Sequence, residues 1–187
     1  GEGEIFYFQK RLGFENKPFF IWKFATMLKD SPNIGTGTIT LRNDPRVTNF
    51  GKYLRISKLN ELPQIINVIK GNMSLVGPRP LDDRAFNAYD KETQKMIYNS
   101  KPGMTGIGSI FFRDEEKLIS NSQMNPEEFY NSIIAPHKGN LEKWYNKRKS
   151  FFLDIILIFL TAWIIIFPSL DLISIIFRDI PKLGDSS

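Results

Sequence analysis

The sequence predicts an α/β fold: a mostly helical, compact domain that lies on a membrane surface, with short strands and an apolar interfacial C-terminal helix. Three features predict it, namely a helix-like stretch over residues 55–80, two short apolar runs near the start of the chain, and a long apolar segment over residues 151–167. From these features we expect a folded domain over residues 1–150, a membrane-associated helical segment over 151–177 and a polar tail over 178–187.

The composition limits the chemistry open to this chain of 187 residues. No cysteine is present, which excludes a disulfide framework, a thiolate metal site and a cysteine nucleophile. The single histidine, His137, follows a proline and is expected at the surface, and alone it makes no multi-histidine metal centre. The net charge of +5 and a pI near 9.3 favour an anionic partner: nucleic acid, acidic lipid or a phosphorylated substrate.

The first part of the chain predicts two strands and a short helix. Residues 5–9 and 18–24 are apolar and aromatic runs that flank a charged turn containing Gly13, which is typical of a β-hairpin. Residues 30–40 predict a loop, because proline, asparagine and glycine residues are concentrated there. A short helix is expected over residues 47–55, and basic residues accumulate around it: Arg42, Arg46, Lys52, Arg55 and Lys58.

The stretch over residues 55–80 combines a helical pattern with polar residues. Apolar residues recur in it at spacings of three and four, which predicts an amphipathic helix: Leu59, Leu62, Ile65, Ile66 and Ile69. Pro63 is tolerated near the start of a helix, so Asn60 and Glu61 are expected at or beside the helix N-terminus. Gly71 is expected to end this helix.

Two interpretations of this stretch stay open on the residues alone. In the first, it is an amphipathic core helix followed by an ordinary turn. In the second, it is an anion site, because a helix N-terminus favours a phosphate. Arg55 precedes the helix start, and the stiff turn over residues 77–80 presents Arg79, whose planar fork of donors suits phosphate.

The next part of the chain predicts further short elements. Residues 81–100 predict a helix, residues 101–109 a glycine-rich loop that allows close approach of a ligand, and residues 110–113 a strand. Residues 126–145 predict a helix with a break at Pro136. An acidic triplet is expected to start a helix and to face solvent or, less often, to hold a metal: Asp114, Glu115 and Glu116.

The apolar segment over residues 151–167 points to a membrane surface. Only Asp154 and Thr161 interrupt it, so a helix formed by it has no obvious water-facing side. It is shorter than the roughly 20 residues needed to cross a bilayer, which favours a helix lying in the interface over a span. A span over residues 155–177 would have to accommodate Pro168 and Asp171. The alternative is a buried core helix of a soluble protein.

Basic and aromatic residues precede this apolar segment, a pattern typical of a cytoplasmic membrane surface that bears anionic lipid. They are Lys138, Lys143, Lys147, Arg148 and Lys149, with the rings of Trp144 and Tyr145. Anionic membrane lipid is therefore an expected partner. The chain begins at Gly1 without signal-peptide character, so we expect a fragment or a processed product.

Seven short motifs follow one another along the chain: Lys23-Phe24, Asp44-Pro-Arg-Val-Thr48, Phe50-Gly-Lys-Tyr-Leu-Arg55, Asn60-Glu-Leu-Pro-Gln64, Asn67-Val-Ile-Lys-Gly71, Met73-Ser-Leu-Val-Gly-Pro-Arg-Pro80 and Pro102-Gly-Met-Thr-Gly106. Together they resemble the bacterial sugar transferase family, the monotopic phosphoglycosyl transferases also described as undecaprenyl-phosphate sugar phosphotransferases. The resemblance covers the chain from about Phe8 to Trp163.

The resemblance implies an enzyme on the cytoplasmic face of the bacterial inner membrane. It would move a sugar 1-phosphate from a nucleoside diphosphate sugar, commonly a UDP-sugar, to polyprenyl phosphate, with Mg²⁺ as cofactor and UMP as leaving group. This reaction begins the synthesis of surface glycans and glycoconjugates. Nucleic acid is not expected as a partner, since only the net charge suggests it. The resemblance also implies a re-entrant membrane helix before the motifs begin.

The resemblance further implies an Asp-Glu pair in the site, where the aspartate attacks the phosphate that carries the sugar and the glutamate binds Mg²⁺. Glu61 matches the metal-binding glutamate, whereas Asn60 stands in place of the nucleophilic aspartate. Substrate binding is assigned to four basic residues: Lys23, Arg46, Arg55 and Arg79. Two smaller departures from the family pattern are Ala25 and Asn72.

A neutral amide is a poor nucleophile, so the departure at Asn60 leaves several alternatives open. Another carboxylate attacks, with Asp114 or Glu115 as candidates; Glu61 attacks; the transfer is direct; or the chain is an inactive homologue that binds nucleotide sugars or acts as a scaffold.

Overall fold

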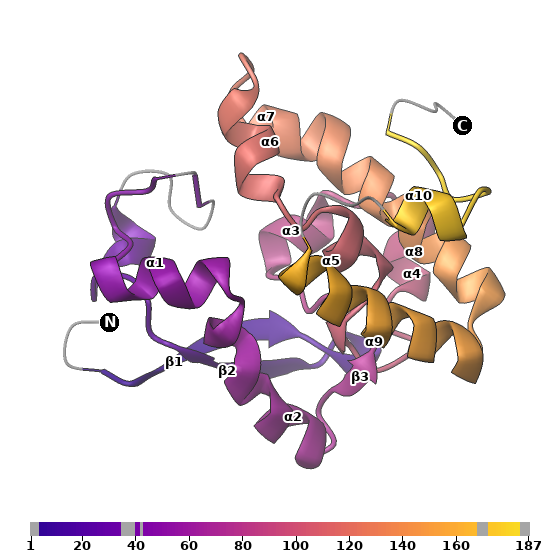
Figure 1. Ribbon diagram of the computed structural model, residues 1–187, viewed down its shortest axis with the longest axis horizontal. Coiled ribbons are helices and arrows are strands. Elements are labelled where there is room, and N and C mark those ends of the chain that lie inside the picture. Colours follow the sequence, from indigo (N-terminus) through magenta and orange to yellow (C-terminus); the bar gives the residue numbers. More distant parts are fainter. Residues whose placement is uncertain (1–3, 35–39, 42, 168–171, 184–187) are drawn as a thin grey trace.

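The structure, a computed structural model, describes residues 4–34, 40, 41, 43–167 and 172–183. It has the mostly helical α/β fold with short strands that the sequence predicts (Figure 1). The described strands form one antiparallel and one parallel pair. Within the described ranges, every helix is too short or too polar to cross a bilayer. Gly1, residues 35–39, Arg42, Pro168 and Asp171, and the last four residues of the expected polar tail lie outside the described residues.

The predicted hairpin is confirmed. Strand β1 (Phe6–Leu12) pairs antiparallel with β2 (Pro18–Phe24), and Phe6 lies opposite Phe24. The turn falls later than expected, because β1 continues through Leu12 and the chain reverses in the short helix η1 (Phe14–Asn16). Aromatic rings pack across the pair, with Trp22 edge-on to Phe6 and Phe8, and such cross-strand pairs stabilise a two-stranded sheet.

The predicted amphipathic helix forms, but its apolar side faces outward. A second short helix, η2 (Ser31–Asn33), and helix α1 (Asn49–Ile56) precede it, and it consists of the 3₁₀ helix η3 (Leu59–Gln64) followed by α2 (Ile65–Ile69). The apolar residues Leu59, Leu62, Ile65 and Ile69 are 44%, 48%, 43% and 80% exposed. Three polar residues are buried instead: Asn60, Gln64 and Asn67. The interpretation as an ordinary core helix is therefore wrong.

Asn67 explains this orientation. Its side-chain amide donates to the backbone oxygen of Phe20 at 2.8 Å, and its Oδ1 accepts from the backbone N–H of Trp22 at 3.0 Å. The Asn67 side chain, which is 1% exposed, therefore provides hydrogen-bond partners for two backbone groups at one edge of β2. The helix ends as predicted, since Gly71 adopts a φ of +77° just after it.

Strand β3 (Ser74–Val76) pairs parallel with β4 (Gly103–Thr105), although the sequence predicts only a loop there. Gly103 and Gly106 of this segment allow two segments of the chain to approach each other closely, and the expected approach of a ligand stays a prediction. A Cβ on Gly103 would lie 2.1 Å from the backbone nitrogen of Gly77. Between the two strands, the single helix predicted over 81–100 is divided into α3 (Asp83–Asn87) and α4 (Lys91–Met96), because Asp82 and Asp90 each cap a separate helix.

Two predictions in the following segment are wrong. Of the strand expected at 110–113, residues 110 and 111 lie in helix α5 (Ile107–Phe111) and residues 112 and 113 form a turn, because Ile107 and Ile110 pack into the core at helical spacing. The expected break at Pro136 is absent from the described chain: the π-helical turn η4 (Tyr130–Ile134) leads directly into α8 (Ala135–Arg148). A wider turn relieves the clash that a proline makes with the preceding turn.

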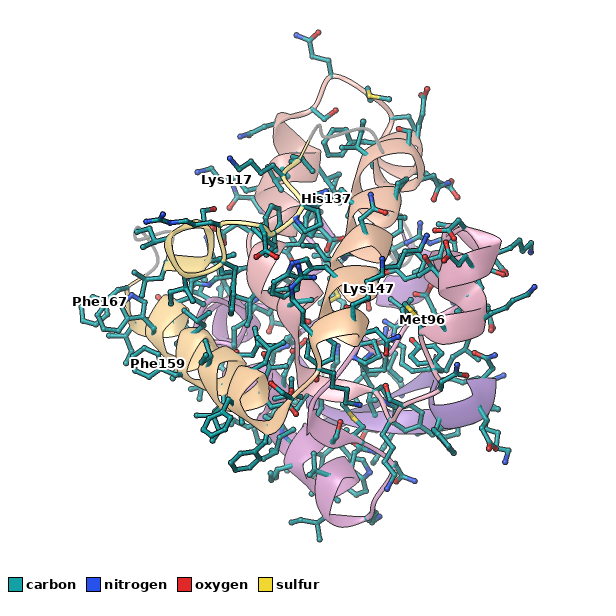
Figure 2. All side chains as sticks on the ribbon, turned by 90° about the vertical axis from the view of Figure 1, so that its right-hand side faces the viewer. Met96, Lys117, His137, Lys147, Phe159 and Phe167 are labelled. Atoms are coloured by element: carbon teal, nitrogen blue, oxygen red, sulfur yellow. The ribbon has the colours of Figure 1, made fainter. Side chains whose placement is uncertain are left out.

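His137, which was expected at the surface, is 5% exposed and lies inside the molecule (Figure 2). Its ring packs against the rings of Phe111 and Phe112, with centroids 4.8 Å and 5.6 Å away. The acidic triplet does start a helix as predicted, α6 (Glu115–Asn121), which α7 (Pro126–Phe129) follows. Residues 122–125 join the two helices.

The apolar segment forms α9 (Phe151–Ile166), capped by the side chain of Ser150. Leu153, Leu157 and Leu160 are buried in the same hydrophobic cluster as the rest of the core, to which α10 (Leu172–Ile176) contributes Ile173. The remaining apolar residues of α9 are mostly exposed, and Phe159 and Phe167 lie on its outer side (Figure 2). Helix α9 therefore contributes one side to the core and exposes apolar side chains on the other.

The expected basic collar before α9 is present only in part, since Lys147 and Lys149 are exposed as predicted. Lys138 is buried, Lys143 pairs with Asp90 and Glu92, and Arg148 pairs with Asp179. The rings of Trp144 and Tyr145 are 6% and 3% exposed, so they belong to the core. Helical periodicity turns this part of α8 inward, which the charge pattern alone did not indicate.

The close packing at Gly103 predicts a large loss of stability on Gly103→Ala. The added methyl group would collide with backbone atoms at 2.1–2.6 Å, so we expect a loss of roughly 3 kcal/mol in the free energy of unfolding. Gly71→Ala is the matched control, because its nearest neighbour is Lys101 Nζ at 3.6 Å and only its positive φ costs about 1–2 kcal/mol. Urea unfolding followed by circular dichroism measures the free energy of unfolding of both variants. Equal losses would contradict the close backbone packing at Gly103.

Candidate active site

The candidate site is centred on Glu61, in the first turn of η3. Its Oε1 accepts from Arg79 Nη2 at 2.8 Å and lies 3.4 Å from Lys23 Nζ. The side chains of Glu61 and Lys23 are 18% and 14% exposed, and that of Arg79 is 41% exposed. Three predicted site residues, from β2, η3 and the turn after β3, therefore meet at one carboxylate oxygen.

Local structure fixes each of these residues. Lys23 lies in β2 opposite Tyr7, and the Asn67 amide attaches the η3–α2 segment to the same strand. The turn that carries Arg79 is held by Tyr98, which is 1% exposed. The Tyr98 hydroxyl donates to the Arg79 backbone oxygen at 2.9 Å and accepts from the Leu81 N–H at 2.8 Å. The site is therefore built on buried hydrogen bonds to the backbone.

The charges in the site perturb one another strongly. Burial by itself raises the pKa of Glu61, but the nearby Arg79, Lys23 and Lys58 outweigh burial and hold that pKa well below its usual range. Burial lowers the pKa of Lys23 to about 8; Glu61 opposes this shift and Arg79 adds to it. Burial also lowers the pKa of Lys58. At neutral pH, three cations surround one ionised carboxylate, an excess of positive charge that suits an anionic ligand.

The start of α6 adds two carboxylates to this region. Glu116 forms an ion pair with Arg55, near the end of α1, and lies in the electrostatic field of Lys58. Glu115 Oε2 accepts from Lys138 Nζ at 2.5 Å, and the Glu115 charge helps to raise the pKa of Arg79. The fold therefore places Glu115 and Glu116 beside the cations of the site, although the sequence predicts that the triplet faces solvent.

Asp114 lies differently from its two neighbours. Its side chain is exposed and does not cap α6. Its backbone oxygen accepts from the N–H groups of Lys117 and Leu118. The expectation of a solvent-facing residue therefore fits Asp114 and in part Glu116, whose side chain is 47% exposed. The catalytic role of Asp114 stays a prediction.

Arg46 is committed to other contacts. It forms a buried ion pair with Asp44 at 2.6 Å and donates to the backbone oxygens of Ser31 and Ile34 at 2.9 Å. The Asp44 hydrogen bond raises the pKa of Arg46. These contacts hold the segment before α1 and do not join Arg46 to Glu61, so its predicted role in substrate binding stays a prediction.

Asn60 is 8% exposed, and its Oδ1 is buried without a hydrogen-bond partner among the described residues. An unsatisfied buried acceptor costs roughly 1–3 kcal/mol. A buried oxygen without a partner is a candidate acceptor for a bound group. As an amide it has no negative charge with which to attack phosphorus.

Sequence reasoning missed Tyr98, Glu116 and Lys138 as parts of this region. Lys58 belongs to the basic residues that precede Glu61 in the sequence, and it holds the left-handed conformation that starts η3. The other three reach the site only through contacts between residues far apart in the sequence.

Comparisons with known proteins place this geometry in context. The family model described as bacterial sugar transferase matches residues 1–168. The uncharacterized sugar transferase EpsL of Bacillus subtilis is 36% identical over 158 residues, which are 84% of this chain and 68% of the relative. The undecaprenyl-phosphate galactose phosphotransferase of Salmonella typhimurium is 29% identical over 88% of the chain and 34% of the relative.

A third relative is the UDP-glucose:undecaprenyl-phosphate glucose-1-phosphate transferase of Escherichia coli. It is 42% identical over 110 residues, which are 58% of this chain and 24% of the relative. The chain therefore spans about two thirds of EpsL, but only a third or less of the two relatives whose names state a reaction.

The contact between Lys23 and Glu61 predicts how the lysine titrates. Glu61→Gln removes the charge that stabilises protonated Lys23, so we expect the pKa of Lys23 to fall further below about 8. Side-chain NMR of labelled lysine against pH measures it, with Lys23→Arg to assign the signal. Glu128→Gln, on the exposed surface of α7, is the control that leaves the midpoint in place. An unchanged midpoint in Glu61→Gln would contradict the coupling.

Proposed function

The chain belongs to the bacterial sugar transferase family, and on that premise we propose that it transfers a sugar 1-phosphate from a nucleoside diphosphate sugar to polyprenyl phosphate. A UDP-sugar is the proposed donor, and the product would begin the synthesis of a surface glycan. The observation that carries the proposal is the meeting of Lys23 and Arg79 at Glu61, with Lys58 in the same electrostatic field. This arrangement suits the two negative phosphates of such a donor.

The residues of the site have distinct roles in this proposal. Arg79 and Lys23 bind phosphate oxygens, and their positive charge offsets the charge that develops as the diphosphate is cleaved. Arg55 is held by Glu116 until a phosphate competes for it. Lys23 differs from the two arginines in its lowered pKa of about 8. Near that pH it changes between its charged and neutral forms, which changes the net charge of the site.

Mg²⁺ is the proposed cofactor, and Glu61 is its proposed ligand. The described residues contain no group of three or more His, Cys, Asp or Glu side chains that could together hold a metal ion. Mg²⁺ nevertheless fits, because it commonly uses one or two protein oxygens and completes its shell with waters and substrate phosphates. Glu61, held ionised, and the unpaired Asn60 Oδ1 supply two such oxygens. Mg²⁺ would neutralise diphosphate charge when bound.

We further propose that the chain works on the cytoplasmic face of the inner membrane, in contact with anionic lipid. Two groups of exposed apolar residues support this. The first is on α1 and α2 and includes Phe50, Ile56 and Ile69, which are 72%, 65% and 80% exposed. The second is on α9 and includes Phe151 and Phe152, which are 74% and 77% exposed. Large apolar side chains at such exposure are typical of a surface that contacts lipid or another protein.

A second candidate function is that of an inactive homologue that binds nucleotide sugars or acts as a scaffold. Asn60 favours it, because this residue stands in the position of the expected nucleophile and carries no charge.

Transfer of radiolabelled sugar phosphate to polyprenyl phosphate tests the enzyme. With the chain in nanodiscs and Mg²⁺ present, we expect transfer from at least one UDP-sugar. Glu61→Gln should lower transfer at least about 100-fold, because it removes the only charged ligand proposed for the cation. Glu127→Gln, an exposed carboxylate of α7, is the matched control that keeps full activity. Donor binding without transfer across all UDP-sugars would instead favour the inactive homologue.

Co-sedimentation with vesicles that contain anionic lipid tests the membrane surface. Replacing Phe151 and Phe152 together by glutamate should lower the bound fraction several-fold, because two charges would then have to leave water at the lipid contact. Leu118→Glu, an exposed apolar residue of α6, is the control and should bind as the unaltered chain does. Equal loss in both variants would argue against a role for the outer face of α9.

A further inference from the structure

The hairpin of β1 and β2 has two edges, and the chain treats them differently. At the β2 edge, the Asn67 side chain bonds to the outward backbone groups of Phe20 and Trp22. At the β1 edge, no other described element packs extensively, since β2 is the main neighbour of β1. The β1 edge is therefore the side of the hairpin at which a partner can bind.

The hydrogen-bond pattern identifies the backbone groups of β1 that point outward. The N–H of Ala25 donates to the backbone oxygen of Ile5 at 3.0 Å, so odd-numbered residues of this strand bond to the opposite strand. In an antiparallel pair, such residues alternate with residues whose backbone groups point away from the partner. Leu12 agrees with this alternation, because its N–H donates outward to the backbone oxygen of Leu81 at 2.8 Å. The other outward residues are Phe6, Phe8 and Lys10.

This edge is open over most of its length. Within the described part of the chain, no hydrogen bond to the outward backbone groups of Phe6, Phe8 or Lys10 is present. Phe6, Tyr7 and Phe8 are 37%, 41% and 48% exposed, which is high for aromatic residues of a strand. A row of unpaired backbone groups beside exposed aromatic side chains is a template for a further strand.

The sequence of β1 is complementary to a second copy of itself. Outward groups of two antiparallel copies match only when even-numbered residues lie opposite even-numbered residues. In the register centred on Tyr7, Phe6 lies opposite Phe8 of the second copy, and Lys10 lies opposite Glu4 of the second copy. Aromatic pairs and pairs of opposite charge across strands stabilise a sheet. The two-fold symmetry makes each of these pairs occur twice.

The two neighbouring registers are less favourable. The register centred on Phe6 places the Glu4 carboxylate opposite the ring of Phe8. The register centred on Phe8 requires the outward N–H of Leu12, which is already bonded within the chain. Of the three, the register centred on Tyr7 alone matches opposite charges and ends before Leu12.

We propose that β1 pairs with β1 of a second copy of this chain, antiparallel and centred on Tyr7, to form a symmetric dimer. The two hairpins then make one four-stranded sheet in the order β2, β1, β1 and β2. Pairing satisfies the outward backbone groups of both copies and covers their exposed aromatic side chains. The Asn67 bonds at each β2 edge close the sheet, so it does not grow beyond two copies.

The chain has no cysteine, so an introduced thiol reports this contact directly. In the full chain, purified in mild detergent and gently oxidised, Tyr7→Cys should form a disulfide-linked dimer, because the two copies of residue 7 face each other within disulfide reach. Phe20→Cys is the matched control, since Phe20 is 58% exposed on β2. Its two copies would lie three strand spacings apart, at least about 14 Å, and should not crosslink.

A mixture of two variants tests the register. When Phe6→Cys and Phe8→Cys are mixed before oxidation, the mixed dimer should exceed both dimers of a single variant, because Phe6 faces Phe8 of the second copy. Predominance of either dimer of a single variant would overturn the register centred on Tyr7.

A charge exchange tests the interface without a crosslink, with sedimentation equilibrium in density-matched detergent as the measurement. Lys10→Glu places like charges opposite each other twice and should raise the dissociation constant of the dimer about tenfold. Addition of Glu4→Lys should restore it. Lys17→Glu, whose wild-type side chain is 75% exposed beyond β1, should dimerise as the unaltered chain does.

Three outcomes would overturn the proposal. The first is an unaltered chain that stays monomeric at every concentration. The second is equal crosslinking of Tyr7→Cys and Phe20→Cys, which would show unspecific association through apolar surfaces. The third is a double variant, Glu4→Lys with Lys10→Glu, that keeps its fold by circular dichroism but does not regain the dimer.

Discussion

The placement of one amide, Asn67, governs the arrangement of the site. By bonding to the backbone of β2 on both sides of Ile21, it turns the polar side of the η3–α2 segment inward. A buried amide that satisfies a strand edge is costly to replace, because either partner alone would be left unpaired. The same orientation brings Glu61 to Lys23 and leaves the apolar residues of the segment outside. The hydrogen bonds of Asn67 therefore determine both the position of the site and the exposure of the apolar surface.

The charges of the site act as one network. Glu61 has two cationic contacts, and Arg55 and Lys138 hold the carboxylates of α6. The pKa of Arg79 is raised chiefly by Glu61 and less by Glu115. Removing a charge from water is costly, so a partly buried charge is tolerated only when it has a partner of opposite charge. An anionic ligand that binds the cations must therefore displace or share existing ion pairs, and it does so among groups already oriented by the fold.

Much of the local structure was open to prediction, and most of the long-range structure was not. The hairpin follows from two aromatic runs around Gly13, and the apolar helix α9 follows from its composition. The sequence predicts a strand at residues 110–113, because Ile110, Phe111 and Phe112 have strand-like side chains, whereas Ile110 and Phe111 lie in α5, where packing against α8 favours a helix. His137 was misplaced for a related reason, since its ring contacts belong to that helix and not to its own neighbours. Within the site, the motifs predicted Glu61, Arg79 and Lys23, but not the ion pairs with α6, which depend on the tertiary fold.

The division of α9 has a practical consequence for handling the protein. Leu153, Leu157 and Leu160 belong to the common core, so the helix folds with the rest of the chain whether or not its outer face is covered. In water without detergent or lipid, the exposed phenylalanines and isoleucines of that face would associate with those of neighbouring molecules. Aggregation during purification would then reflect an intact fold with an uncovered surface, and a mild detergent, not a stabilising mutation, would be the remedy.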